Sequence, residues 1–323
     1  MSQTTFEGIG LSSSIAEKGF ALVEHDITTD EIDALISAYA TFTDELPDPD
    51  LFTVHSMIKD SEHLDDLSYA SDHKRQWHKY RTNHPQYAKP GGYTNRSLQI
   101  KALRFYGRDH DAIGKPVEDD PKEYYHYHPN SLVKMKAMHD EFGWGPIPPE
   151  VIALHTRFAT IWRLANTAMS STFQLLEEEH PELMSRFTRP EDLATSPLRL
   201  IFYHPGQGDI LAGGHYDKST FTMQIAESHL GLRARNPVTQ EMGLVQRPAK
   251  EAAVFPGLLW DRMYPDSSLE PTWHDVINMD EVNPGLNIRG RKCARWALIW
   301  FSNSTALNIP QKADTHTIAE TII

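Results

Sequence analysis

The sequence contains almost no cysteine, because Cys293 is the only one among 323 residues. A disulfide scaffold needs at least one pair of cysteines, so that class of protein is excluded. A zinc or iron–sulfur site built from several cysteines of one chain is excluded for the same reason. Any metal that this chain holds must therefore be bound through nitrogen and oxygen atoms.

Long apolar segments are missing as well. No run of 18 apolar residues occurs, so no membrane-spanning segment is predicted and no membrane partner is expected. Residues 1–26 lack the basic region and following apolar stretch that mark a secretory signal. We therefore expect a cytoplasmic protein.

Positive charge is scarce relative to negative charge. The chain has 31 Lys and Arg against 44 Asp and Glu, a net charge of −13, and no basic stripe offsets this excess. Nucleic acid is therefore not an expected partner. Because 40% of the residues are hydrophobic, the bulk of the chain is not disordered and can bury a sizeable core.

The first half of the chain shows one strand followed by helical patterns. GFALVE (19–24) is typical of a buried strand, and Thr28 and Glu31 have the spacing of a helix capping box. The apolar stripe of the longest predicted helix runs from Leu154 to Leu175. Residues 44–130 predict short elements and long loops, and the histidines of YYHYHPN (124–130) are interpreted as loop packing.

After Pro197 the hydrophobic period changes from 3.6 to 2, which predicts strands. Small residues at 211–214 predict a turn. The short, closely spaced strands favour an antiparallel sandwich or barrel over a parallel βαβ sheet. The seven predicted strands cover residues 198–204, 219–225, 231–235, 243–247, 252–255, 272–278 and 293–301.

A His-x-Asp tripeptide joins His215 and Asp217, whose side chains project to the same side of an extended chain. Chance alone produces about two such His-x-Asp or His-x-Glu tripeptides here, and four occur, at His63, His139, His180 and His215. Only the tripeptide at His215 opens a predicted strand, with His274 on a second one. Two histidines and a carboxylate are typical ligands of non-haem Fe(II), although a structural role is the alternative.

Arg295 stands inside the apolar run CARWALIWF and shares a predicted strand face with Cys293, Ala297 and Ile299. Burying a guanidinium without a partner is costly. Two interpretations remain open at this point. The partner is either a structural salt bridge or an anionic ligand, such as a carboxylate held in bidentate fashion.

These motifs together resemble the isopenicillin N synthase-like branch of the Fe(II)/2-oxoglutarate-dependent oxygenases. LRLIFYHPGQGDILAGGHYDKSTFTMQI (198–225) is similar to the family pattern L-R-x-N-x-Y-P-P, G-x-x-x-H-x-D and L-T-x-L. TWHDVIN and RWALIWF are similar to its H-R-V and R-x-S-x-x-x-F strands, and GFALVEHDITTDEIDAL (19–35) to its opening. The resemblance extends from about residue 19 to residue 302.

The resemblance implies a mainly β fold with N-terminal helices and a double-stranded β-helix (jelly-roll) core flanked by α-helices. It divides the chain into a mixed helical region at 1–150, packed on the barrel, and a unit at 151–323 that holds the long helix and the catalytic core. The function implied is a dioxygenase that uses Fe(II), 2-oxoglutarate and O₂. It would hydroxylate, desaturate or cyclise a small-molecule substrate, with succinate and CO₂ as co-products.

Site residues follow from the same resemblance. It implies that His215, Asp217 and His274 bind Fe(II). Arg295 would bind the distal carboxylate of 2-oxoglutarate, and Tyr203 would donate a hydrogen bond to this co-substrate. No protein general base is expected beyond the metal site.

Three departures from the family pattern favour an alternative. Ile201 replaces the usual Asn and Ala297 replaces the Ser of R-x-S, so two polar contacts to the co-substrate are lost. The 21 residues from His274 to Arg295 are more than is usual, which predicts an extended hairpin loop over 278–292. The alternative is a same-fold Fe(II) oxidase that uses no 2-oxoglutarate, with Arg295 bound to a substrate carboxylate.

Two further alternatives concern the anion-binding residue and whether the protein is an enzyme. Residues 289 and 291 in the extra loop are arginines that could compete with Arg295 for an anion. A non-catalytic binding protein of the same fold is also conceivable, but such a protein is expected to lose a metal ligand first. The complete His215, Asp217 and His274 set argues against it.

Overall fold

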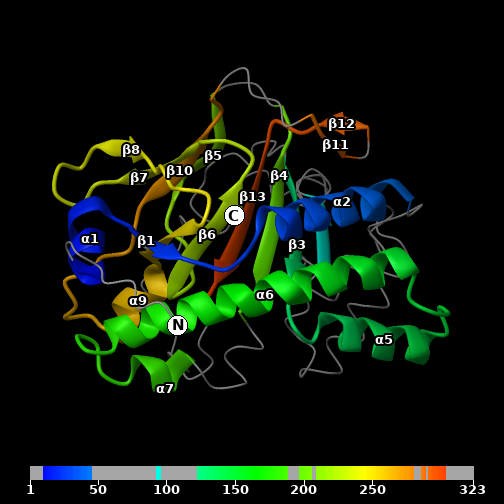
Figure 1. Cartoon of the computed structure of the whole chain (residues 1–323), viewed down its shortest axis with the longest axis horizontal. Helices are drawn as coiled ribbons and strands as arrows, with labels where there is room; N and C mark the ends of the chain where they lie inside the picture. The colour runs from blue at the N-terminus through cyan, green and yellow to red at the C-terminus, as the bar shows by residue number, and fades with distance from the viewer. Residues whose placement is uncertain are drawn as a thin grey trace, which may run out of the picture.

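Two large antiparallel β-sheets, a short two-stranded ribbon and several helices make up the described part of the chain (Figure 1). The structure is a computed structural model. It describes the residue ranges 10–45, 92–95, 122–187, 196–205, 209–279, 285–288 and 290–302. This arrangement confirms the prediction of a β-rich fold with antiparallel sheets and N-terminal helices.

The helices are α1 (Leu11–Lys18), α2 (Thr29–Glu45), α5 (Ser131–Phe142), α6 (Pro149–Leu176), α7 (Leu183–Phe187) and α9 (Leu258–Met263). The predicted capping box starts α2, because the Thr28 backbone N–H donates to Glu31 Oε2 (2.8 Å) and the Glu31 N–H donates to Thr28 Oγ1 (3.3 Å). Helix α6 begins with a proline at its first position, where no N–H partner is needed. No described helix has the length and hydropathy that a bilayer span requires.

Helix α1 is a correction to the prediction that the described chain opens with a strand. Its residues 11–18 carry only a weak apolar pattern, and the helix ends at Gly19, which has a left-handed φ of 84°. A β-carbon on Gly19 would lie 2.6 Å from the Arg235 carbonyl oxygen. Glycine is therefore required both by the backbone conformation and by the close packing.

The larger sheet has seven strands in the order β1-β9-β6-β13-β4-β3-β2. Three of them come from the N-terminal 150 residues: β1 and β3 pair with strands of the second half, and β2 pairs with β3. The predicted boundary at residue 150 therefore runs through one sheet, and the division into two regions stays a prediction. The strands are β1 (Ala21–Glu24), β2 (Gly92–Asn95), β3 (Lys122–Tyr127), β4 (Leu198–Tyr203), β6 (Phe221–Glu227), β9 (Glu251–Pro256) and β13 (Arg295–Phe301).

Both faces of this larger sheet are buried. On β4, Leu198, Leu200 and Phe202 belong to the main hydrophobic core with residues of α2 and α6, which lie side by side across the sheet (Figure 1). Ile201 and Tyr203 belong instead to a second apolar cluster shared with the smaller sheet. Side chains alternate along a strand, so one set of β4 side chains packs in the helical core and the other set faces the space between the sheets.

The smaller sheet has four strands in the order β5-β10-β7-β8. Its members are β5 (Ile210–His215), β10 (His274–Ile277), β7 (Leu232–Arg235) and β8 (Met242–Leu244). All seven predicted strands are thus present. The turn predicted at 211–214 is wrong, because these residues form most of β5. Position 214 requires glycine because the Trp273 ring packs against it, 2.6 Å from where a β-carbon would lie.

The hairpin loop predicted over 278–292 is also wrong. Strand β10 belongs to the smaller sheet and β13 to the larger one, so they are not partners in a hairpin. The described part of the connection carries its own two-stranded ribbon, β11 (Asn287–Ile288) and β12 (Arg291–Lys292). The extra residues therefore cross from one sheet to the other.

Candidate active site

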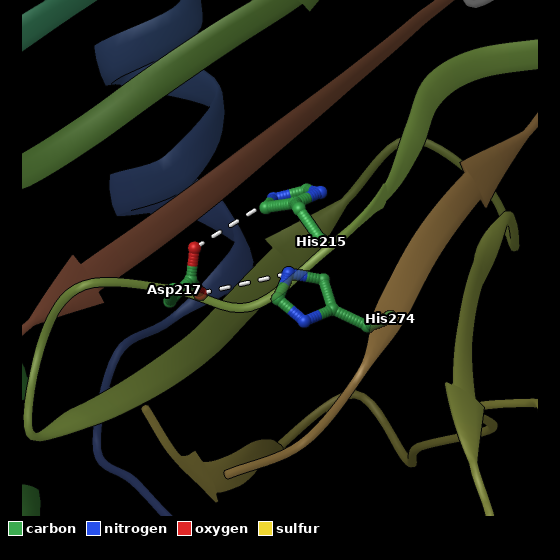
Figure 2. A group of neighbouring side chains, drawn as sticks. All are labelled: His215, Asp217 and His274. Atoms are coloured by element: carbon green, nitrogen blue, oxygen red, sulfur yellow. Dashed lines mark ion pairs between the residues drawn. The ribbon is translucent and has the colours of Figure 1, made fainter. Parts of the chain in front are cut away.

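Two histidines and an aspartate converge at the edge of the smaller sheet (Figure 2). One ligand atom each from His215, Asp217 and His274 lies within 4.8 Å of the others. The Nε2 atoms of His215 and His274 lie 3.7 Å and 3.6 Å from the two carboxylate oxygens of Asp217. Within the described residues this is the one group of three or more His, Cys, Asp or Glu side chains with such spacing.

Strand pairing brings the two histidines together. His215 ends β5, His274 begins β10, and the two residues are direct partners in the antiparallel ladder. Directly paired residues project to the same face, so their rings lie with centroids 4.4 Å apart. The prediction that His215 opens a strand is therefore wrong, since it closes one, but the structure does bring it beside His274.

Backbone carbonyls orient both rings. His215 Nδ1 lies 2.7 Å from the Gly213 carbonyl oxygen, and His274 Nδ1 lies 3.0 Å from the Thr272 carbonyl oxygen. A carbonyl accepts a hydrogen bond, so each Nδ1 carries the proton and each Nε2 keeps its lone pair for a metal. The chemistry of this donor set, two imidazole nitrogens and one carboxylate, fits Fe(II).

Asp217 is held from two sides in the loop after β5. The Thr222 hydroxyl of β6 donates to Asp217 Oδ2 (2.6 Å), and the Leu258 N–H donates to the Asp217 carbonyl oxygen (2.8 Å). Gly257 permits this packing, because a β-carbon there would lie 2.3 Å from the Ser219 carbonyl oxygen and 2.7 Å from that of Asp217. The carboxylate is thus positioned before any ligand binds.

The electrostatics of the site favour the ligand forms of these groups. Desolvation, with a smaller contribution from His274, lowers the pKa of His215 to about 4, so its ring is neutral at pH 7. Burial alone would raise the pKa of Asp217, but His274, His215 and the Thr222 hydroxyl together hold that pKa below its ordinary value. A neutral imidazole and an ionised carboxylate are the forms that bind a metal ion.

The triad opens onto a cavity of about 220 Å³ between the two sheets. Its opposite wall comes from the larger sheet and carries the cationic side chains Lys122, Arg199 and Arg295. The sequence does not indicate Lys122 or Arg199 as site residues, because a lone Lys or Arg in a strand gives no signal of the cavity it faces. Tyr203 and Arg295, both predicted for the site, line this cavity together with the triad.

Arg295 is buried, with 1% of its side chain exposed, and has a carboxylate partner. Its Nη2 donates to Glu227 Oε2, and its Nε donates to the His229 carbonyl oxygen (3.3 Å). Glu227 also lies 3.6 Å from Arg247 Nε, so two guanidinium groups share one carboxylate. The structural salt bridge is therefore present, and Arg295 still lines the cavity, so the two interpretations of this residue are compatible.

The two departures from the family pattern lie side by side. Ile201 on β4 and Ala297 on β13 are direct partners in the ladder, and both line the cavity. Next to them, Tyr203 pairs with Arg295, whose Cζ lies 5.6 Å from the Tyr203 ring centroid. One row of the wall is thus apolar and the adjacent row is polar.

The competing sequence candidates take structural roles or fall outside the described residues. His139 packs on Trp144 with its Nδ1 3.0 Å from the Gly145 carbonyl oxygen, and His180 packs on Trp260. Residues 63 and 289 and the side chain of residue 291 are not among those described. The histidines of 124–130 were predicted in a loop, but His126 belongs to strand β3.

Comparison with known proteins shows which solved structures share this fold. No protein-family model and no curated protein sequence matches the chain. Among solved structures, a Shewanella oneidensis protein described as an oxygenase aligns with a TM-score of 0.55 at 18% identity, over 91% of this chain and 84% of that one. A full-length Neurospora crassa protein in complex with alpha-KG and thymine aligns with a TM-score of 0.55 at 16% identity, over 91% and 79%.

A third structure, a 2OG-Fe(II) oxygenase family protein from Caulobacter crescentus, aligns with a TM-score of 0.53 at 17% identity, over 91% of this chain and 81% of that one. Such low identities establish a common fold and nothing finer. The expectation that this chain has a fold found among 2OG-Fe(II) oxygenases is confirmed at that level. The chain has the fold of the Fe(II)/2-oxoglutarate-dependent oxygenases.

Proposed function

We propose that this protein is an Fe(II)- and 2-oxoglutarate-dependent oxygenase that oxidises a small molecule in the cavity between its sheets. The observation that carries the proposal is the triad of His215, Asp217 and His274, with both Nε2 atoms turned toward the carboxylate. Its place in a fold shared with 2OG-Fe(II) oxygenases supports the same conclusion. The two sheets are interpreted as a double-stranded β-helix, and a cytoplasmic location stays a prediction.

Bound Fe(II) would supply O₂ activation coupled to oxidative decarboxylation of 2-oxoglutarate, which yields succinate and CO₂. The protein's own contribution is positional. His215 and His274 are held by backbone carbonyls and Asp217 by Thr222, so the ligands need no rearrangement on metal binding. His215, Asp217 and His274 would hold the metal beside the cavity that they line.

Arg295 is the proposed partner of the distal carboxylate of 2-oxoglutarate, and Tyr203 the proposed hydrogen-bond donor beside it. Glu227 balances part of the buried positive charge, while Arg247 neutralises part of Glu227. Two guanidinium groups against one carboxylate leave a local excess of positive charge. A second carboxylate is therefore favoured at this end of the cavity.

The alternative is an Fe(II) oxidase of the same fold that uses no 2-oxoglutarate. The apolar pair of Ile201 and Ala297 favours it, because the co-substrate loses two polar contacts at adjacent positions. In that case Arg295 would bind a carboxylate of the substrate. The retained Tyr203 and Arg295 row favours the 2-oxoglutarate-dependent reaction.

Anaerobic titration with Fe(II), with and without 2-oxoglutarate, tests the proposal. We expect a weak visible metal-to-ligand charge-transfer band that needs both components and is lost in His274→Ala. His139→Gln is the matched control, because it removes a histidine of another His-x-Glu tripeptide that lies outside the triad, and it should keep the band. Fe(II) binding without a band would favour the oxidase, and no Fe(II) binding would contradict both enzymes.

A further inference from the structure

Arg199 is a second arginine of the cavity wall, and its position differs from that of Arg295. It lies on β4 among the residues that line the cavity. Its Cζ stacks over two rings, 5.0 Å from the Tyr124 centroid and 4.7 Å from the Phe301 centroid. The guanidinium plane is therefore fixed by aromatic faces on neighbouring strands.

The one hydrogen bond of Arg199 that the described residues show involves Nε and not its two terminal nitrogens. Its Nε donates to Nε2 of His126, the residue directly opposite on β3. Among the described residues, nothing accepts a hydrogen bond from its two terminal nitrogens, and no carboxylate lies within ion-pair distance of them. Arg295, by contrast, already contacts Glu227.

Arg199 is also connected to the proposed metal ligands. Phe301, which stacks on it, pairs with Thr222 in the ladder of β13 and β6. Thr222 in turn donates to Asp217, one of the proposed metal ligands. The chain Arg199, Phe301, Thr222, Asp217 therefore connects this guanidinium to the triad through adjacent contacts.

Part of the wall around Arg199 is apolar, and Lys122, Thr222 and Gln224 add polar groups to it. Ile201, Ala297 and Ile299 line the cavity on its own sheet, and Phe255 and Val276 line it from other strands. A guanidinium with two terminal nitrogens in one plane matches the two oxygens of a carboxylate. A small cavity in which such a guanidinium lies beside apolar side chains favours a small organic acid.

We propose that Arg199 binds a carboxylate group of the substrate that is oxidised, so that this substrate is a small organic acid with an apolar body. The inference rests on the proposed function, because it assigns Arg295 to the co-substrate and Arg199 to the substrate. His126 is then a positioning residue that holds Nε of Arg199 and leaves the terminal nitrogens for the ligand.

Binding of matched acids and esters tests this assignment. The probes are benzoate, phenylacetate, 3-phenylpropionate and hexanoate, each with its methyl ester, added to the full chain loaded with redox-inert Mn(II) and 2-oxoglutarate. We expect at least one acid to bind while its ester does not. Paramagnetic relaxation of its protons by Mn(II) should show that it lies beside the metal.

Variants then identify the residue. Arg199→Gln should weaken that acid at least about tenfold, which is the range of a charge-assisted hydrogen-bond pair, and leave 2-oxoglutarate affinity within about twofold. Arg199→Lys, which keeps the charge, should keep part of the acid binding and controls for folding. Arg157→Gln, an exposed arginine of α6, is the matched control and should change nothing.

Three outcomes would overturn the inference: no acid binds the unmodified protein, acids and esters bind equally, or Arg199→Gln leaves acid binding unchanged. A loss of 2-oxoglutarate affinity in Arg199→Gln would reassign this arginine to the co-substrate. Failure of the proposed function is a separate result. It would appear as absent Mn(II) or 2-oxoglutarate binding in the unmodified protein, before any acid is added.

Discussion

The two walls of the cavity differ in the side chains that they present and in what holds those side chains in place. The smaller sheet presents two histidines, one of them neutral at pH 7 by its lowered pKa, and both rings are oriented by backbone carbonyls. The larger sheet presents arginines, which stay charged at any physiological pH. The position of the histidines depends on strand register and loop packing. The position of the arginines depends on how their buried charge is balanced.

This contrast shows where each wall is vulnerable. A histidine ligand needs a neutral ring and a fixed orientation, both of which the local backbone supplies. A buried arginine needs a compensating charge that comes from elsewhere in the chain, as Glu227 does for Arg295. Changes on the larger sheet should therefore affect stability as well as binding, while changes on the smaller sheet should affect metal binding first.

The largest expected effect is that of Arg295→Leu. It removes a partner of buried Glu227, so the free energy of unfolding in urea should fall by about 3–5 kcal/mol. Binding of 2-oxoglutarate should be lost while Mn(II) binding is retained. Adding Glu227→Gln should restore much of the stability but not 2-oxoglutarate binding. Unchanged 2-oxoglutarate affinity in Arg295→Leu would leave this arginine only its structural role.

Gly231→Ala tests the same arginine without removing it. A β-carbon there would lie 2.8 Å from the Ile277 carbonyl oxygen and 2.9 Å from Arg295 Nε, so one of them must move. We expect a stability loss of about 1–3 kcal/mol and weaker 2-oxoglutarate binding by calorimetry. Gly213→Ala is the control, because nothing lies within 4 Å of its β-carbon. Equal behaviour of the two variants would contradict the packing argument.

Thr222→Val removes the hydroxyl that donates to Asp217 at nearly constant volume. Loss of such a supporting hydrogen bond should reduce Mn(II) affinity about tenfold, with little change in the 2-oxoglutarate contacts proposed at Arg295. Titration followed by electron paramagnetic resonance measures this affinity. Thr167→Val, at an exposed position of α6, should bind Mn(II) as the unmodified protein does. An unchanged affinity in Thr222→Val would mean that Asp217 needs no support.

The smallest expected effect concerns a histidine on the helical side of the larger sheet. Burial lowers the pKa of His155 to about 4, and its Nε2 lies 2.6 Å from the Tyr125 hydroxyl oxygen. The unfolded chain therefore binds a proton that the folded chain does not as pH falls from about 6.5 to 4. Unfolding free energy should fall in that window by roughly 1 kcal/mol per pH unit.

His155→Gln should make this decline less steep, and urea titrations at several pH values measure the slope. Above pH 7 both proteins should show the same slope, because the histidine is neutral in both states there. A slope that is identical below pH 6.5 would show that His155 is protonated in the folded protein. The other histidines whose pKa is lowered by burial, namely His25, His180, His215 and His229, would then account for the acid sensitivity.

The sequence alone determined the parts of this protein that depend on local pattern. Strands at 198–204 and 293–301 follow from alternating or continuous apolar residues, and the start of α2 follows from the capping pair Thr28 and Glu31. The order of motifs around His215 and His274 predicted the group of side chains that the structure brings together, and its role as a metal site is a proposal. Cys293 as the only cysteine already limited any metal to nitrogen and oxygen ligands.

Only the tertiary structure decided which distant residues share a wall. Glycines at 213 and 214 look like a turn in the sequence, yet they belong to a strand that pairs with β10, and Trp273 packs against Gly214. The partner of Arg295 is 68 positions away, and the availability of Arg199 depends on the ladder that sets His126 opposite it. Pairing between sheets and the balance of buried charge are non-local, so no window of sequence reveals them.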